Sequence, residues 1–222
     1  MRKPRLLPFL CLLFTSLALW ANVVNAAGQN VNDYIREHVE RHQMSGRMVL
    51  AGADIAGLDI FWKLYENNDY APLWQKQERI DELIGMVGRA EEEGLLPRDY
   101  HHEILLNLRN TNSRDAADIA EFDMLLTDSL MRYVYHRYFG KANPADLDSD
   151  WNLGRRMDRD PLELIVGTMA AADMRQHIVE TFDWGPYYQQ MKALLADYRE
   201  RAAREGGGYP ALPSGQTLRK GM

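Results

Sequence analysis

A single uninterrupted segment, from Asp115 to Gly140, constrains the fold more than any other feature of the sequence. It reads DAADIAEFDMLLTDSLMRYVYHRYFG, and helical spacing gathers most of its large apolar side chains on one wide face: Ile119, Phe122, Leu126, Leu130, Tyr133 and Val134. Gly140 stands where a helix commonly ends. An apolar face of this width predicts a long helix that is buried on more than one side.

Shorter segments before this helix repeat the helical period. Residues 31–42 form one amphipathic pattern, and Asp54 is expected to cap a helix whose apolar face is Ile55, Leu58, Trp62 and Tyr65. Residues 78–93 carry a stripe of Ile80, Leu83, Ile84, Val87 and Ala90. Gly94 then predicts a left-handed helix end, and Pro97 predicts the first turn of the next helix.

The segments after Gly140 are also helical, once a long connection at 141–159 is passed. Asp160 and Pro161 predict a helix start, and a second short helix is expected at 174–182. A closing helix follows, with these residues expected to face the core: Tyr187, Met191, Leu194, Leu195 and Tyr198. The only candidate strand covers residues 48–51. We therefore predict an all-α domain of about eight helices with one long ordered connection.

The first 26 residues have the pattern of a secretory signal peptide. Arg2, Lys3 and Arg5 precede an apolar run that ends at small residues, which predicts cleavage after Ala26. A retained membrane anchor is the alternative. Cleavage removes Cys11, the only cysteine, and three positive charges, so the net charge goes from −6 to −6 − 3 = −9. The mature chain then has no thiolate nucleophile, and its acidity argues against nucleic-acid binding.

Several residue patterns imitate functional sites, and each has a simpler interpretation. His38 and His42 lie one helical turn apart, as metal ligands can. The glutamate between them does not directly follow the first histidine, as the zinc-protease pattern requires. His101 and His102 point in different directions on a helix, and we expect them at the surface. The sequence contains neither a Gly-x-Ser-x-Gly elbow nor a Ser-x-x-Lys pair, so no serine nucleophile is predicted.

Acidic and aromatic clusters are equally unspecific. Asp146, Asp148 and Asp150 imitate a calcium loop, but Trp151 and Met157 occupy the positions that need glycine and glutamate, so a turn that buries Trp151 is expected. The run from Glu91 to Glu93 is expected to be a solvated helix end. Acidic residues are plentiful, but no feature of the sequence identifies one pair of them as the general acid and base of a glycan-cleaving site. The aromatic cluster near the end of the long helix could stack sugars, but its helical spacing fits core packing better. Its members are Tyr133, Tyr135, Tyr138 and Phe139.

Four stretches together resemble a known family. They are FWKLYENNDYAPLW, AEEEGLLPRDYH, DMLLTDSLMRYVYHRYFGKANP followed by LDSDWNL, and YYQQMKALLADYR. In this order they resemble the scaffold region that precedes the catalytic part of large Gram-negative L,D-transpeptidases of the YcbB type. The resemblance covers roughly residues 48–205. It implies four parts: a signal peptide (1–26), an amphipathic helix or linker (27–47), a helical scaffold domain (48–205) and a linker toward an absent peptidoglycan-binding-like module (206–222).

The resemblance implies a periplasmic, non-catalytic scaffold that takes part in peptidoglycan cross-linking. Family members use a catalytic cysteine in a Ser-His-Gly-Cys-x-Arg motif, which this sequence lacks. We therefore expect no catalytic, cofactor-binding or metal-binding residue, and a chain truncated before the catalytic domain. Expected partners are peptidoglycan or a transpeptidase catalytic domain, with membrane contact only through the signal peptide. A stand-alone helical binding module is the alternative, and an independent hydrolase is the third hypothesis.

Overall fold

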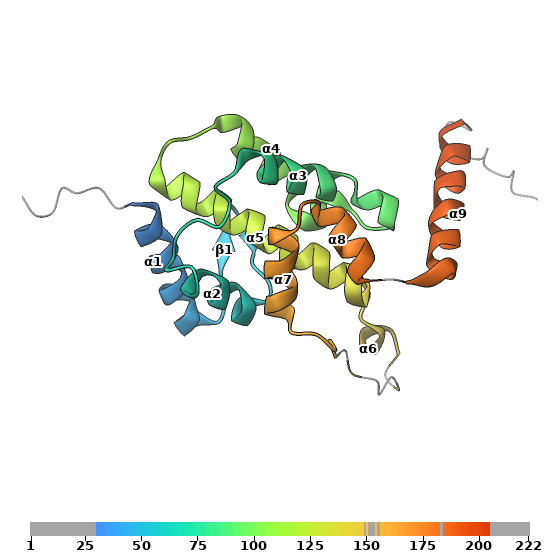
Figure 1. The fold of residues 1–222 in the computed structure, drawn as a ribbon, viewed down its shortest axis with the longest axis horizontal. Coiled ribbons are helices and arrows are strands. Elements are labelled where there is room, and N and C mark those ends of the chain that lie inside the picture. Colours follow the sequence, from blue (N-terminus) through green and yellow to red (C-terminus); the bar gives the residue numbers. More distant parts are fainter. Residues whose placement is uncertain (1–29, 149, 151–153, 155, 183, 205–222) are drawn as a thin grey trace, which may run out of the picture.

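A computed structural model describes residues 30–148, 150, 154, 156–182 and 184–204, and it confirms the all-α class. The long helix α5 (Ala116–Phe139) runs through the middle of the molecule (Figure 1). Asp115 caps its start by accepting a hydrogen bond from the backbone N–H of Ala117, and Gly140 follows its last residue, as predicted. The signal peptide and the segment 206–222 lie outside the described residues.

The first half of the chain packs against α5 from two sides. Helix α1 (Val31–Ser45) and α2 (Leu58–Glu66) flank a short hairpin of β1 (Val49–Leu50) and β2 (Ala53–Asp54). Helix α3 (Gln77–Gly88), the short 3₁₀ helices η1 (Ala90–Glu93) and η2 (Pro97–Tyr100), and α4 (His102–Thr111) follow. Both α1 and α4 contact α5 directly.

The second half adds two helices to this body, together with a short helix in the connection after α5 and one helix at the end of the molecule. The connection after α5 contains the short helix α6 (Pro144–Leu147). Helix α7 (Pro161–Ala170) contacts α2 and α5, and α8 (Met174–Thr181) contacts α3 and α7. Helix α9 (Gly185–Arg204) stands at one end of the molecule and contacts η1 (Figure 1).

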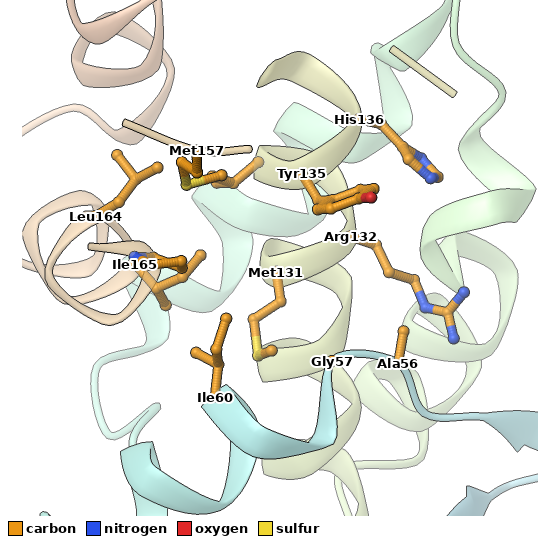
Figure 2. A pocket seen from close by; sticks show the side chains of 12 residues that line it. Ala56, Gly57, Ile60, Met131, Arg132, Tyr135, His136, Met157, Leu164 and Ile165 are labelled. Atoms are coloured by element: carbon orange, nitrogen blue, oxygen red, sulfur yellow. The ribbon is translucent and has the colours of Figure 1, made fainter. Parts of the chain in front are cut away.

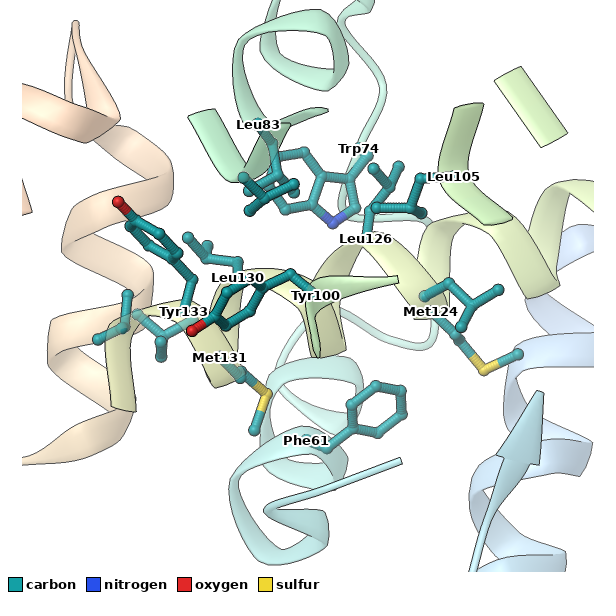
Figure 3. Close-up of a cluster of buried hydrophobic side chains, with 14 of the residues drawn as sticks. Phe61, Trp74, Leu83, Tyr100, Leu105, Met124, Leu126, Leu130, Met131 and Tyr133 are labelled. Atoms are coloured by element: carbon teal, nitrogen blue, oxygen red, sulfur yellow. The ribbon is translucent and has the colours of Figure 1, made fainter. Parts of the chain in front are cut away.

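The core lies around α5, where its apolar face meets helices from both halves. Leu126 and Leu130 are fully buried there, as predicted, beside Phe61 and Tyr100 (Figure 3). Ile119 departs from the prediction, because it lies near the exposed start of α5. Burying this many large side chains is the main source of stability for a helical domain of this size.

A buried polar network centred on Asp123 fixes the turn between α2 and α3. Its carboxylate accepts hydrogen bonds from the hydroxyl of Tyr65 at 2.8 Å and from the backbone N–H of Trp74 at 2.8 Å. The side chain of Thr127 accepts one from the indole of Trp74 at 3.0 Å. Burial raises the pKa of Asp123 to about 6, against the lowering effect of these hydrogen bonds.

Two local predictions were wrong. Asp54 does not cap α2 but lies in β2, and the residue before α2 is Gly57 with a left-handed φ of 57°. Gly57 fits because a Cβ there would come within 3.0 Å of the Met131 side chain. Ile55 is accordingly buried ahead of the helix and is not on its face.

Candidate docking surfaces

The first candidate site is an apolar cavity of about 370 Å³ between α2, α5 and α7. Figure 2 shows Ile60 from α2, Met131 from α5, and Leu164 and Ile165 from α7 pointing toward it. Arg132, Tyr135 and His136 of α5 lie at its polar edge. A cavity with this lining suits an apolar side chain or a small apolar ligand, with few groups that could orient it by hydrogen bonding.

The wall of this cavity is held by the buried carboxylate of Asp128. It accepts hydrogen bonds from the backbone N–H of Ala56 at 2.7 Å and from Nε of Arg132 at 2.5 Å. Nε2 of His101 lies 2.6 Å from Oδ2 of the same carboxylate. The surface location predicted for His101 is therefore wrong, because the ring is buried against Asp128. His102, in contrast, is half-buried, with its ring next to Gly88.

A second buried carboxylate, Glu93, joins α9 to the body. Its side chain is 2% exposed and forms an ion pair at 2.8 Å with Arg137, which is 4% exposed. Glu93 also accepts from Nζ of Lys192 at 2.6 Å and from the hydroxyl of Tyr188 at 2.7 Å. Burial would raise its pKa, but the hydrogen bonds from Lys192 and Tyr188 and the charge of Arg137 outweigh this and lower it.

The prediction that the run from Glu91 to Glu93 is a solvated helix end is thus wrong at Glu93. Glu92 fits it better, because its side chain is 48% exposed and pairs with Arg175 at the surface. The backbone carbonyl of Glu91 accepts a hydrogen bond from Arg199 of α9. Two of the three glutamates in this run therefore contact α9.

Helix α9 is rotated by about one residue from the orientation predicted, and of the five residues expected in the core only Leu195 faces the body. A row spaced at i, i+4, i+7 and i+11 faces the body: Tyr188, Lys192, Leu195 and Arg199. The apolar row one residue earlier, which was expected in the core, is exposed: Tyr187, Met191, Leu194 and Tyr198. We call this second row the α9 seam. It is the second candidate docking surface.

The other predicted candidates do not converge on a site. His38 stacks on His42 with ring centroids 6.0 Å apart, and Nδ1 of His38 is buried with no hydrogen-bond partner among the described residues. Asp148 accepts a hydrogen bond from the backbone N–H of Asp150 at 3.0 Å, as a turn residue does. Trp151 lies outside the described residues. Within those residues, no group of three or more histidine, cysteine or acidic side chains could hold a metal ion.

The aromatic cluster at the end of α5 divides between core and surface. Tyr133 is buried, which raises its pKa to about 12, whereas Tyr135 is exposed. Tyr138 and Phe139 are half-buried and in ring contact, with centroids 4.7 Å apart. Core packing therefore accounts for part of this cluster, and Tyr135 is its exposed member.

None of the described helices has the length and apolar character needed to cross a membrane. The carboxylates of Asp128 and Glu93 are each occupied by several protein donors. The apolar cavity and the exposed apolar face of α9 are surfaces that suit docking.

Comparison with known proteins identifies the family. No curated protein and no solved structure matched the chain. The family model described as "Scaffold domain" matches residues 61–195, which run from α2 to the middle of α9. They include the Glu93 cluster and the cavity walls that α5 and α7 supply. This match covers more than half of the sequence, and the chain therefore belongs to the Scaffold domain family.

Proposed function

We propose that this chain is a non-catalytic scaffold module of the L,D-transpeptidase system that cross-links peptidoglycan, of the YcbB type. The observation that carries the proposal is the Scaffold domain match over residues 61–195. The finer assignment is supported by the four sequence stretches that resemble the region preceding the catalytic part of those enzymes. The chain acts in the periplasm, after export by a signal peptide that is cleaved following Ala26.

The absence of catalysis follows from the chemistry that such enzymes require. Forming the peptide cross-link needs a thiolate that attacks an amide carbonyl and a base that manages its proton. Cys11, the only cysteine, is removed with the proposed signal peptide. The chain from Ala27 onward, incubated with a muropeptide donor and an acceptor, is expected to yield no cross-linked product. A cross-linked product would refute the assignment as non-catalytic.

The scaffold role requires a surface that receives a catalytic partner, and we assign this to the cavity between α2, α5 and α7. Its apolar lining would accept an apolar side chain from the catalytic domain of a transpeptidase. Ile60→Trp adds volume inside the cavity, and Leu106→Trp, at an exposed position of α4 away from it, is the control. The binding partner is a transpeptidase catalytic domain supplied as a separate protein, and binding is measured by calorimetry.

We expect Ile60→Trp to weaken this binding at least tenfold, and Leu106→Trp to leave it within twofold. Circular dichroism of both variants checks that the fold is intact. Equal binding by the two variants would place the catalytic partner elsewhere on the scaffold. Absence of binding by the unmodified chain would count against the transpeptidase assignment itself.

A specific observation favours peptidoglycan binding as a second function. A row of contacting rings runs from Tyr135 through Phe139 and Tyr138 to Trp184, and its two end rings are exposed. Flat, exposed rings of this kind suit stacking against ligand surfaces. Tyr135→Ala should reduce recovery of the chain with purified sacculi. Equal recovery of Tyr135→Ala and the unmodified chain would exclude the ring row as the binding surface.

A further inference from the structure

The α9 seam is an apolar stripe on a helix that is fixed to the body by its neighbouring row. Tyr187 is 73% exposed and Tyr198 is 62% exposed, and Met191 and Leu194 between them are each nearly half exposed. The steps along the seam are four, three and four residues. This alternation is the spacing with which one helix packs along another in a coiled coil.

The width of the seam limits its occupant to one further helix. Seam and body-facing row are offset by one residue, about 100° around the helix, so the body does not cover the seam. The remaining exposed positions of α9 include Gln190 and Ala193, which bound the apolar stripe. A stripe of single-residue width bounded by polar and small side chains is typical of a helix–helix contact and narrower than a face buried in a core.

The seam is complementary to itself in antiparallel orientation. A two-fold axis midway between residues 192 and 193 sets Tyr187 opposite Tyr198 of a second copy. The same axis sets Met191 opposite Leu194. Every seam position thus meets a seam position, aromatic against aromatic and aliphatic against aliphatic, as an isologous interface requires.

The helix dipole of α9 favours the same orientation. The arginines in its C-terminal half do not oppose it, because Arg201 pairs with Asp197 and Arg204 pairs with Glu200 within the helix. In a parallel pair the two helix dipoles would point the same way side by side, whereas in the antiparallel pair they oppose.

We propose that two copies of this chain pair through an antiparallel contact between their α9 seams. The contact spans about 16 Å, since 11 residues separate Tyr187 from Tyr198 at about 1.5 Å each. This is short of a standard interface, so the pairing is weak and reversible. The inference is independent of the transpeptidase resemblance, because it requires no enzyme partner.

Sedimentation velocity of the chain from Ala27 onward, between about 1 and 300 µM, tests the pairing. We expect a monomer at the low end and a growing dimer fraction at the high end. Met191→Lys should raise the Kd at least tenfold, because it puts two charges into the centre of the contact. Ala193→Lys adds the same charge on an exposed part of α9 outside the seam and should leave the Kd within twofold.

Orientation is tested by cross-linking, which exploits the absence of cysteine after position 11. Chains carrying M191C or L194C are mixed and oxidised mildly. Antiparallel pairing predicts that the mixed disulfide exceeds both like disulfides, whereas parallel pairing predicts the reverse. The proposal is overturned by a monomer at every concentration, by a dimer that Met191→Lys leaves intact, or by an excess of like disulfides.

Discussion

Replacing Glu93 by glutamine should destabilise the protein far more than the same change at its neighbour Glu92. Glu93→Gln keeps the side-chain shape but leaves the guanidinium of Arg137, 4% exposed, without its ion-pair partner. Removing one partner of a buried ion pair costs about 3–5 kcal/mol, because the remaining charge stays buried. The amide oxygen can still accept one hydrogen bond, so we expect the lower end, about 3 kcal/mol.

Glu92→Gln provides the matched control. Its ion pair with Arg175 is at the surface, with side chains 48% and 39% exposed. Surface pairs of this kind contribute about 0–1 kcal/mol. Urea denaturation followed by circular dichroism measures both variants against the unmodified chain. If the two substitutions lower the free energy of unfolding by equal amounts, the reasoning from burial is wrong.

The loss at Glu93 should also be localised to α9. The donors Tyr188 and Lys192 come from this helix, and η1 is its main neighbour in the body. Hydrogen exchange in the Glu93→Gln variant should therefore accelerate over 186–204 before it accelerates in α5. Unchanged exchange in α9, together with a lower overall stability, would mean that Glu93 stabilises the body and does not anchor the helix.

Three further substitutions test other parts of the fold. Burial raises the pKa of Asp123 from 3.8 to about 6, so the folded state binds a proton more tightly than the unfolded state. Stability should then fall by about 2 kcal/mol as the pH rises from 4 to 6, and Asp123→Asn should remove this dependence in urea titrations at several pH values. Leu126→Ala should cost about 2–5 kcal/mol in the same assay, because Leu126 is fully buried. Asp160→Ala removes the cap that accepts from the N–H of Leu162 and should lower the free energy of unfolding by about 1 kcal/mol.

The helices could be predicted from the sequence because each carries a local signal. The stop at Gly140 and the Asp160–Pro161 start both lie where the structure has them. Gly94 has the predicted left-handed φ of 74°. Such signals depend on neighbours within one or two turns, and the sequence contains those neighbours in order. The cap assigned to Asp54 failed because the hairpin, a longer-range pairing, takes that residue into β2.

The candidate surfaces could be predicted less well, because they depend on partners distant in the chain. Glu93 is identical in local sequence character to Glu91 and Glu92, and only Arg137 and α9 distinguish it. His101 is buried by Asp128, 27 residues away. One signal was available: Asp123, Asp128 and Arg137 interrupt the apolar pattern of α5, and charged residues inside such a pattern need partners when buried.

Hydrophobicity alone predicted the wrong row of α9 to face the body. Its apolar row and its body-facing row are adjacent and equally long, so burying either one would satisfy the helical period. The choice is made by Arg137, which needs a buried anion, and by Glu93, which takes its remaining donors from Tyr188 and Lys192. Once that cluster forms, the apolar row must face outward.

This arrangement links the two candidate surfaces through one helix. Arg132, at the edge of the cavity, and Arg137, in the Glu93 cluster, lie five residues apart on α5, and each pairs with a buried carboxylate. The cavity and the α9 seam are therefore both tied to the C-terminal half of α5. A partner seated in the cavity and a second copy paired on the seam would be held at a spacing set by that half of the helix, as a scaffold requires.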